Sequence, residues 1–385
     1  MGIILGIDAS NISSGGGLTH LVELLSSADV TRSIFGRVHI WCSQSTSDSL
    51  PQKEWLIVHT PRWCNQRVAV RAVCQQVLLP GCLHREKIDL LLSPGGIVPF
   101  ITSSRVVSMC QNMLPFEDEE ASLFGRLSKM TIKMKILKYL LTWSFRRSDG
   151  VIFLSDYALQ EVEKKIGLGN RFLEVIPHGI HHRFRSSHRR NKGGAAKRDK
   201  IRILYVSIKM PYKHQIEVME AVSMLTVKGY NIRLILAGQD SGDYGKSVEK
   251  KRFLLDPKGD TIIDLKHVDH SSIHSLYDTA DIFVFASSCE NMPNILLEAM
   301  ASGLAIACSA KGPMPEVLGD AGVYFEPDSA ISIAYALEVL LSNETDAKQL
   351  GDKASERSSK YSWGTCSSQT LEFLSGIHIR PERNE

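Results

Sequence analysis

Short apolar runs alternate with longer amphipathic segments along the whole chain. Fully apolar runs of this length predict strands buried on both faces, and the segments between them predict helices that cover a parallel sheet. In the first half the expected strands are 3–8, 38–42, 55–58, 88–92, 106–110 and 151–154. In the second half they are 201–206, 232–237, 261–265, 282–285 and 304–308. The repeated pattern predicts an α/β protein with two doubly wound domains in tandem.

The expected domain boundary lies at residues 177–179, and a length of 385 residues is sufficient for two domains. We expect residues 1–178 to form the first domain, residues 179–360 the second, and residues 361–385 a final helix that crosses back to the first. Residues 181–202 are polar, basic and glycine-containing, with Asp199 as their only acid. That composition is typical of a linker or an exposed loop.

One segment carries only positive charge. No acidic residue occurs between Glu120 and Asp149, and apolar residues at three-to-four spacing predict an amphipathic helix over residues 126–147. Such a helix either lies on an anionic membrane surface or presents an ordinary solvated face. The seven basic residues are Arg126, Lys129, Lys133, Lys135, Lys138, Arg146 and Arg147.

The composition is that of a soluble globular protein, with 43% hydrophobic and 23% charged residues. A net charge of +3 gives no reason to expect a nucleic-acid partner. None of the eight cysteines forms a Cys-x-x-Cys pair or has zinc-finger spacing to histidines, so reduced structural cysteines are expected.

The first ten residues lack a basic segment and their apolar run stops at Asp8, so they predict a core strand and not a signal peptide. No stretch reaches the ~20 apolar residues that span a bilayer. We therefore expect a cytoplasmic protein whose membrane contact is peripheral, on the inner face of the cytoplasmic membrane.

Gly15, Gly16 and Gly17 lie between the first strand and a helix expected to start near Leu18. Glycines let backbone amides approach an anion, but a tight structural turn explains them as well, since the spacing lacks the third glycine of a dinucleotide fingerprint.

Residues 289–303 hold the strongest candidate site. Glu290 is expected in the loop at the carboxyl end of a strand, where open α/β sheets bind ligands. Pro293 is expected to open a helix, so that the amides of Asn294 and Ile295 form a cradle for a diphosphate at its N-terminus. Glu298 follows in that helix, where it is either a hydroxyl-binding carboxylate or a solvated residue.

The pattern Glu290-x7-Glu298 followed by AMASG resembles the signature of retaining, two-Rossmann-domain glycosyltransferases of the GT-B type, family 4. The resemblance extends over nearly the whole chain and includes GVIFLS at 150–155, IPHGI at 176–180, YKH at 212–214 and PEVLGDAG at 315–322. The segment QNMLPF at 111–116 is similar to that of bacterial O-antigen and capsule enzymes. The resemblance implies two domains facing a central cleft, with the donor on the second and the acceptor on the first.

By this resemblance Glu290 contacts the donor sugar, Glu298 the donor ribose and Lys213 the diphosphate. The family's arginine five residues before the lysine is replaced by Ile208, and the adjacent Lys209 offers a point charge without the planar fork of arginine. The family's histidine near the sugar is also absent, which leaves that role to Gln111 or Asn112. His178 is expected near the hinge, either as a structural residue or as a proton carrier.

The chemistry implied is transfer of a hexose, with retention, from a nucleotide sugar to a glycan or lipid-linked acceptor in bacterial surface polysaccharide synthesis. GDP-mannose is our expected donor, with a UDP-hexose as the alternative, and the base is expected to be read by loops near residues 238–243 and 267–271. No Asp-x-Asp motif points to a metal ion or another cofactor, and Asp118, Glu119 and Glu120 predict an exposed acidic turn. A non-catalytic sugar-binding subunit, a nucleotide-sugar epimerase and a phosphorylase remain alternatives on the same architecture.

Overall fold

The computed structural model describes residues 2–185, 200–269 and 272–379. Within these residues the chain divides into two compact units. Unit 1 comprises residues 1–116, 132–179 and 361–385, and unit 2 comprises residues 117–131 and 180–360. Most of the predicted linker lies outside the described residues.

Unit 1 is built on a seven-stranded sheet with the order β3-β2-β1-β4-β5-β6-β7, in which all paired strands are parallel. Its apolar strands alternate with helices, as the sequence pattern predicts. The strands are β1 (Ile3–Asp8), β2 (Phe35–Trp41), β3 (Leu56–His59), β4 (Leu90–Ser93), β5 (Arg105–Met109), β6 (Gly150–Phe153) and β7 (Phe172–Val175).

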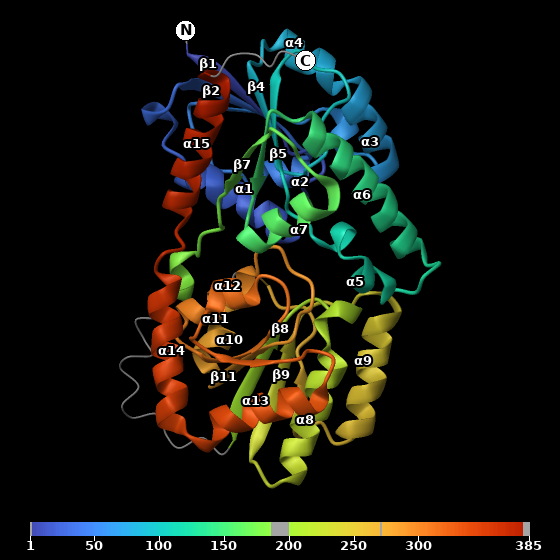
Figure 1. Cartoon of the computed structure of the whole chain (residues 1–385), viewed down its shortest axis with the longest axis vertical. Coiled ribbons are helices and arrows are strands. Elements are labelled where there is room, and N and C mark those ends of the chain that lie inside the picture. Colours follow the sequence, from blue (N-terminus) through green and yellow to red (C-terminus); the bar gives the residue numbers. More distant parts are fainter. Residues whose placement is uncertain (1, 186–199, 270–271, 380–385) are drawn as a thin grey trace. The chain divides into compact units, whose positions relative to one another are not determined.

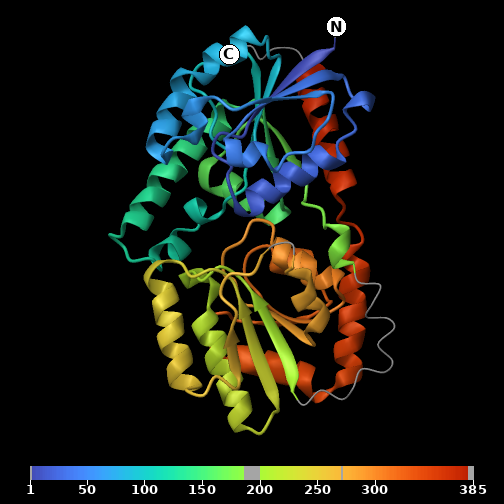
Figure 2. The same ribbon diagram turned by 180° about the vertical axis from the view of Figure 1, so that it is seen from behind.

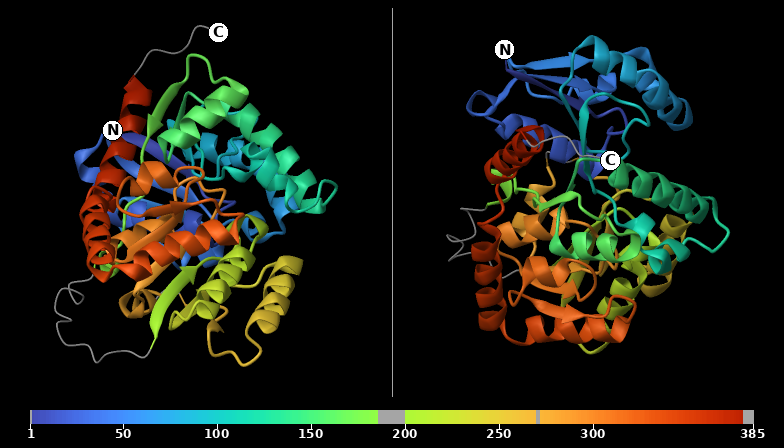
Figure 3. Two further views of the ribbon diagram at one scale, coloured as in Figure 1. Left: turned by 60° about the horizontal axis from the view of Figure 1, so that its bottom comes forward. Right: turned by 45° about the horizontal axis from the view of Figure 1, so that its top comes forward.

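Helices cover both faces of this sheet. The longer ones are α1 (Gly15–Ser27), α3 (Val68–Val77), α4 (Leu79–Arg85), α6 (Lys129–Arg147), α7 (Asp156–Ile166) and α15 (Trp363–Ile379), and α2 (Gln44–Ser47) is a single turn. Helix α15 packs beside α1, shown as a red helix next to a blue one in Figure 3. Helix α6 begins in the part of the chain that belongs to unit 2.

Unit 2 holds a six-stranded parallel sheet with the order β10-β9-β8-β11-β12-β13. Its strands are β8 (Ile201–Val206), β9 (Ile232–Ala237), β10 (Ile262–Asp264), β11 (Ile282–Phe285), β12 (Ala305–Ser309) and β13 (Val323–Phe325). Its helices are α5 (Asp118–Ser122), α8 (Gln215–Val227), α9 (Gly242–Leu255), α10 (His274–Thr279), α11 (Asn294–Ala301), α12 (Met314–Leu318), α13 (Ala330–Ser342) and α14 (Glu344–Ser358). Figures 1 and 2 show this sheet with its helices from opposite sides.

The two doubly wound domains predicted from the sequence are therefore present. Two strands were missed for local reasons. β7 alternates between exposed and partly buried residues at the sheet edge, and β13 has only three residues, so neither forms a fully apolar run. The glycines were also misplaced, because α1 begins at Gly15 and they form its first turn. Pro293 precedes α11 and does not lie inside it.

The described residues include no helix that is long and apolar enough to cross a membrane.

Candidate active site

The sheet of unit 2 reverses its strand order between β8 and β11, which are hydrogen-bonded neighbours although they are far apart in sequence. In open parallel sheets the helices on the two sides of such a point diverge and leave a ligand-binding crevice at the carboxyl ends of the strands. Lys213 follows β8, and Glu290 follows β11. The fold therefore brings both residues to this position.

Lys213 and Glu290 form an ion pair at this switch point, between the lysine Nζ and the glutamate Oε1. Lys213 is only 6% exposed, and its ammonium lies over the rings of Tyr212 and Phe285, at 5.2 Å and 5.7 Å from their centroids. A buried ammonium needs a negative partner, and aromatic faces add further stabilisation. Removing either charge thus leaves the other uncompensated.

Hydrogen bonds hold the two loops together. The Ser288 amide donates to the Tyr212 carbonyl at 2.9 Å, and the Ser288 hydroxyl lies 3.0 Å from His214 Nε2. The same hydroxyl donates to Glu120 Oε2 at 2.6 Å, so α5 is also attached to this site. The expected exposed acidic turn is a short helix in which Asp118 and Glu119 are exposed, whereas Glu120 is partly buried and accepts this hydrogen bond. Sequence spacing could not reveal the link, because 168 residues separate its partners.

Glu298 lies in α11 and accepts a hydrogen bond from the Tyr277 hydroxyl at 2.9 Å. Burial raises the pKa of Glu298 to about 7, although the Tyr277 hydroxyl and the charge of Arg183 act to lower it. At neutral pH this carboxyl is thus close to its midpoint. Tyr277 packs against Phe283 and also positions Glu298.

Asn294 and Ile295 are the first two residues of α11, and both are partly exposed. The Asn294 amide donates to the Met292 carbonyl at 3.0 Å, which shapes the turn before the helix. Helix N-termini carry partial positive charge, so this end of α11 favours an anion.

Lys209 is 1% exposed and lies in a separate network, where its Nζ is 2.5 Å from Asp240 Oδ1 and 2.5 Å from Asp264 Oδ2. Lys266 pairs with both of these aspartates, and its Nζ lies 3.3 Å from Asp240 and 2.9 Å from Asp264. Two carboxylates thus already neutralise the charge that we assigned to the diphosphate, and the donor role of Lys209 stays a prediction.

The candidate residues of unit 1 lie in three places. A Cβ atom at Gly17 would lie 3.1 Å from Gln111 Oε1, so α1 passes close to the loop after β5, and neighbouring Gly16 is exposed. Asn112 is exposed, and its Oδ1 accepts a hydrogen bond from the Leu114 amide at 3.1 Å. His178 is 5% exposed, and its ring lies 4.6 Å from that of His20.

Unit 1 has its own switch point between β1 and β4, and a polar network there was missed from the sequence. Asp8, at the end of β1, accepts a hydrogen bond from Gln75, whose Oε1 in turn accepts one from Asn11 at 3.1 Å. Arg71 donates to Asn11 at 3.2 Å. Burial raises the pKa of Asp8, and hydrogen bonds from Ser10 and Gln75 act to lower it. Its members come from β1, the loop that follows it and α3, so only the folded chain assembles the network.

Two parallel Rossmann-like sheets, one with a lysine–glutamate pair at its switch point, define the architecture of a GT-B glycosyltransferase. The profile of "Glycosyltransferase Family 4" matches residues 15–184, and that of "Glycosyl transferases group 1" matches residues 187–357. The chain is a GT-B glycosyltransferase whose first half is a family 4 domain and whose second half is a group 1 domain.

Among similar proteins is the O-antigen chain mannosyltransferase B of Escherichia coli, 29% identical over 107 residues. That match covers 28% of this chain and 28% of the relative, so it reaches well under half of either protein. Similar folds include the sucrose-phosphate synthase of Thermosynechococcus elongatus, with a TM-score of 0.75, 16% identity and coverage of 96% and 98% of the two chains. Anabaena HepE in complex with UDP and glucose has a TM-score of 0.72, 18% identity and coverage of 97% and 100%.

Proposed function

We propose that this chain transfers a hexose from a nucleoside diphosphate sugar to a glycan or lipid-linked acceptor in the synthesis of a bacterial surface polysaccharide. The Lys213–Glu290 pair at the switch point of unit 2 is the observation that carries the proposal. The similar E. coli protein is an O-antigen chain mannosyltransferase, which supports the polysaccharide role.

In the proposed reaction the bond between the anomeric carbon and the diphosphate breaks, and negative charge develops on the leaving diphosphate. Lys213 and the amides at the start of α11 would stabilise that charge, because preorganised positive groups in a buried site need no rearrangement as the charge develops. The proposed transfer includes no metal ion.

Glu290 would accept hydrogen bonds from the donor sugar, and Glu298 from the ribose. Ionised Glu298 accepts hydrogen bonds from hydroxyls more strongly than the protonated form does, so donor binding would draw its pKa below the value of about 7 that burial produces. We further propose that the acceptor hydroxyl attacks with retention of anomeric configuration, as the resemblance to family 4 implies, and that Gln111, Asn112 and His178 lie on the acceptor side.

We propose GDP-mannose as the donor. The E. coli relative is a mannosyltransferase by name, which supports mannose. A UDP-hexose is the alternative, because a protein of similar fold binds UDP and glucose.

The decisive experiment compares the thermal unfolding of the chain in the presence of UDP, GDP, ADP, CMP and TDP. A nucleotide at ~100 times its dissociation constant adds ~2.7 kcal/mol of stability, so one diphosphate is expected to raise the Tm clearly. Lys213→Ala is expected to abolish most of that rise, because it removes the buried ammonium assigned to the diphosphate, whereas Lys209 is already paired with Asp240 and Asp264.

Lys348→Ala, an exposed lysine in α14, serves as the control and should respond like the wild type. If none of the five nucleotides stabilises the wild type, the chain is not a nucleotide-sugar transferase and the non-catalytic alternative replaces it. If UDP stabilises it and GDP does not, the donor is a UDP-hexose.

We also propose that unit 1 docks on the anionic inner face of the cytoplasmic membrane. The exposed face of α6 carries a row of apolar residues, Ile132, Ile136 and Tyr139. Helical periodicity places Lys133 and Lys135 on the two sides of this row. Its other face, with Met134, Leu141 and Phe145, is buried, so the helix is amphipathic as expected. Apolar side chains between basic ones are typical of helices that lie at a lipid interface.

The same surface continues beyond the helix that the sequence indicated. Val73 and Val77 of α3 are 63% and 68% exposed, and Ile101 in the loop after β4 is 78% exposed. That loop connects the two helices, because the Phe100 amide donates to Gln76 of α3 at 2.7 Å and the Phe100 ring packs on Trp143 of α6 at 4.7 Å.

This surface, which comprises α3, the loop 97–104 and residues 132–147 of α6, contains no acidic residue. Segments 60–85, 90–116 and 121–148 all lack aspartate and glutamate. Charge complementarity therefore favours an anionic lipid surface as its partner, and each lysine near such a surface contributes ~1 kcal/mol.

The double variant Lys133→Glu/Lys135→Glu is expected to reduce binding to anionic liposomes at least ~30-fold in a sedimentation assay, since two lysine contributions are lost and repulsion is added. Val73→Ser/Val77→Ser should weaken binding without changing its salt dependence. The matched control Lys250→Glu/Lys348→Glu makes the same charge change on exposed residues of unit 2. Equal sedimentation of all three variants would refute this docking surface.

A further inference from the structure

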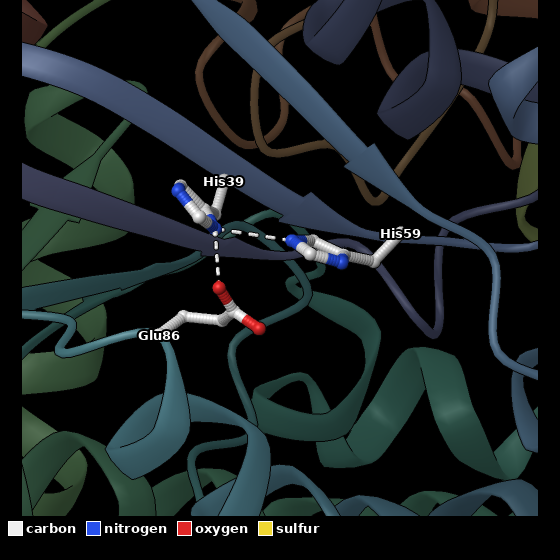
Figure 4. Close-up of side chains that lie close together, drawn as sticks. All are labelled: His39, His59 and Glu86. Atoms are coloured by element: carbon white, nitrogen blue, oxygen red, sulfur yellow. Dashed lines mark hydrogen bonds and ion pairs between the residues drawn. The ribbon is translucent and has the colours of Figure 1, made fainter.

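Two histidines and a glutamate of unit 1 point their side chains toward one another, and none of the three belongs to the candidate active site (Figure 4). His39 Nδ1 lies 3.0 Å from His59 Nε2 and 3.8 Å from Glu86 Oε2. All three potential ligand atoms lie within 4.8 Å of one another.

The sheet register creates this cluster. Strands β2 and β3 are parallel, with His39 opposite Ile57 and Trp41 opposite His59. Side chains two residues apart on a strand share a face, so His39 and His59 project from the same side of the sheet on neighbouring strands. Glu86 immediately follows α4, which packs on that side.

The three side chains are held in place by their neighbours. The His59 ring is stacked on Trp41 at 4.8 Å with an interplanar angle of 8°, which fixes its plane. The Arg85 Nε lies 3.2 Å from Glu86 Oε1, which leaves Oε2 directed at His39. Hydrogen bonds of this kind to the far oxygen of a carboxylate orient ligands in metal sites.

The protonation state also suits a metal ion. Burial lowers the pKa of both His39 and His59, so both imidazoles are neutral at pH 7 and carry a lone pair for coordination. His39 is only 6% exposed, whereas Glu86 is partly exposed, so solvent reaches the cluster on the glutamate side.

A hydrogen bond between the two histidines explains the distance of 3.0 Å between His39 and His59. It does not explain why Glu86 Oε2 also lies close to His39. Zinc binds imidazole nitrogen and carboxylate oxygen at ~2.0–2.2 Å, so tetrahedral ligand atoms lie ~3–4 Å apart. The separations of 3.0 Å and 3.8 Å fall in that range. Two imidazoles and a carboxylate are a donor set typical of zinc, and three protein ligands leave a fourth position for water.

We propose that His39, His59 and Glu86 bind one divalent transition-metal ion, zinc foremost, which ties the edge strand β3 and the end of α4 to β2. The proposal is independent of the sugar-transfer chemistry, because all three ligands belong to unit 1 and none is assigned to the donor. The ion would stabilise the domain and take no part in the reaction.

The test titrates the EDTA-treated, full-length protein with zinc in the presence of a chromophoric chelator of known affinity. We expect one zinc ion per chain. His59→Gln and Glu86→Gln should each weaken its binding by more than the ~10–100-fold that loss of an outer-shell partner costs. Zinc should also raise the Tm of the wild type and leave that of His59→Gln unchanged.

Two control variants test the location of the ion. His84→Gln changes an exposed histidine in α4, close to the cluster, and His182→Gln changes one of the adjacent pair His181 and His182. Both should bind zinc as the wild type does. Since Glu86 is partly exposed, Glu86→Gln keeps the test valid if a histidine variant fails to fold. Wild-type zinc affinity in Glu86→Gln, or loss of binding in His182→Gln, would overturn the proposal.

Discussion

Replacing Glu290 by glutamine is expected to lower the rate of sugar transfer by about 10²–10³-fold, the loss that follows removal of one preorganised electrostatic group. Glutamine keeps the shape of the side chain and removes its charge, so the change acts on the donor sugar and on Lys213 together. The measurement is kcat with saturating donor and acceptor.

Thermal unfolding of Glu290→Gln with a bound nucleotide shows whether Glu290 acts in the reaction or only maintains the structure of the site. In Glu290→Gln the Lys213 ammonium loses its partner while staying buried, and a bound diphosphate would supply a new one. We therefore expect the nucleotide diphosphate to raise the Tm of Glu290→Gln at least as much as that of the wild type. Lys213→Ala should lose both turnover and this stabilisation.

The exposed Glu326, which pairs with Lys311 at 3.0 Å, provides the matched control. Glu326→Gln removes one charge from unit 2 and should retain wild-type turnover. Wild-type turnover in Glu290→Gln would refute its assigned role.

Gly238→Ala is expected to destabilise unit 2 by about 3 kcal/mol or more, because it combines backbone strain with a steric clash. Gly238 follows β9 with a φ of +152°, and an added Cβ would lie 1.9 Å from the Ser207 carbonyl oxygen. That oxygen is backbone and cannot rotate away. The ends of β8 and β9 would have to separate, which would also displace the Lys209–Asp240 pair.

Gly229→Ala is the control, since Gly229 has a φ of +97° but open space around it. It measures strain alone and should cost ~1 kcal/mol. All five tryptophans of the chain lie in unit 1, at positions 41, 55, 63, 143 and 363.

Tryptophan fluorescence therefore follows unit 1, and circular dichroism follows both units. Gly238→Ala should lower the dichroism midpoint and leave the fluorescence midpoint in place. A dichroism midpoint no lower than that of Gly229→Ala would contradict the predicted clash.

The strands that carry the candidate site were predictable because they are buried on both faces. β8, β9 and β11 have the bounds expected from their apolar runs. A strand that is covered on both faces is apolar at nearly every position, so the run itself marks where the strand begins and ends. The edge strand β7 escaped prediction for the opposite reason. In β7 the sheet leaves one face open to solvent, and Glu174 interrupts the run.

The sequence was less informative about charges. It placed Lys209 and Lys213 at the end of the same strand, and both were assigned to the diphosphate. In the folded chain Lys213 pairs with Glu290, whereas Lys209 is taken up by Asp240 and Asp264. Which carboxylate a lysine meets depends on strand order, and order is not encoded in spacing along the chain.

The sequence by itself determined the two doubly wound domains, the position of Glu290 after a buried strand and the basic, amphipathic character of α6. These follow from local periodicity, which the chain carries residue by residue. Only the tertiary structure decided the Tyr277–Glu298 hydrogen bond, the continuation of the basic surface onto α3 and the cluster of His39, His59 and Glu86. Each of these features joins residues from different elements. Neighbouring parallel strands are separated in sequence by a long connection, so spacing along the chain does not show which side chains will meet.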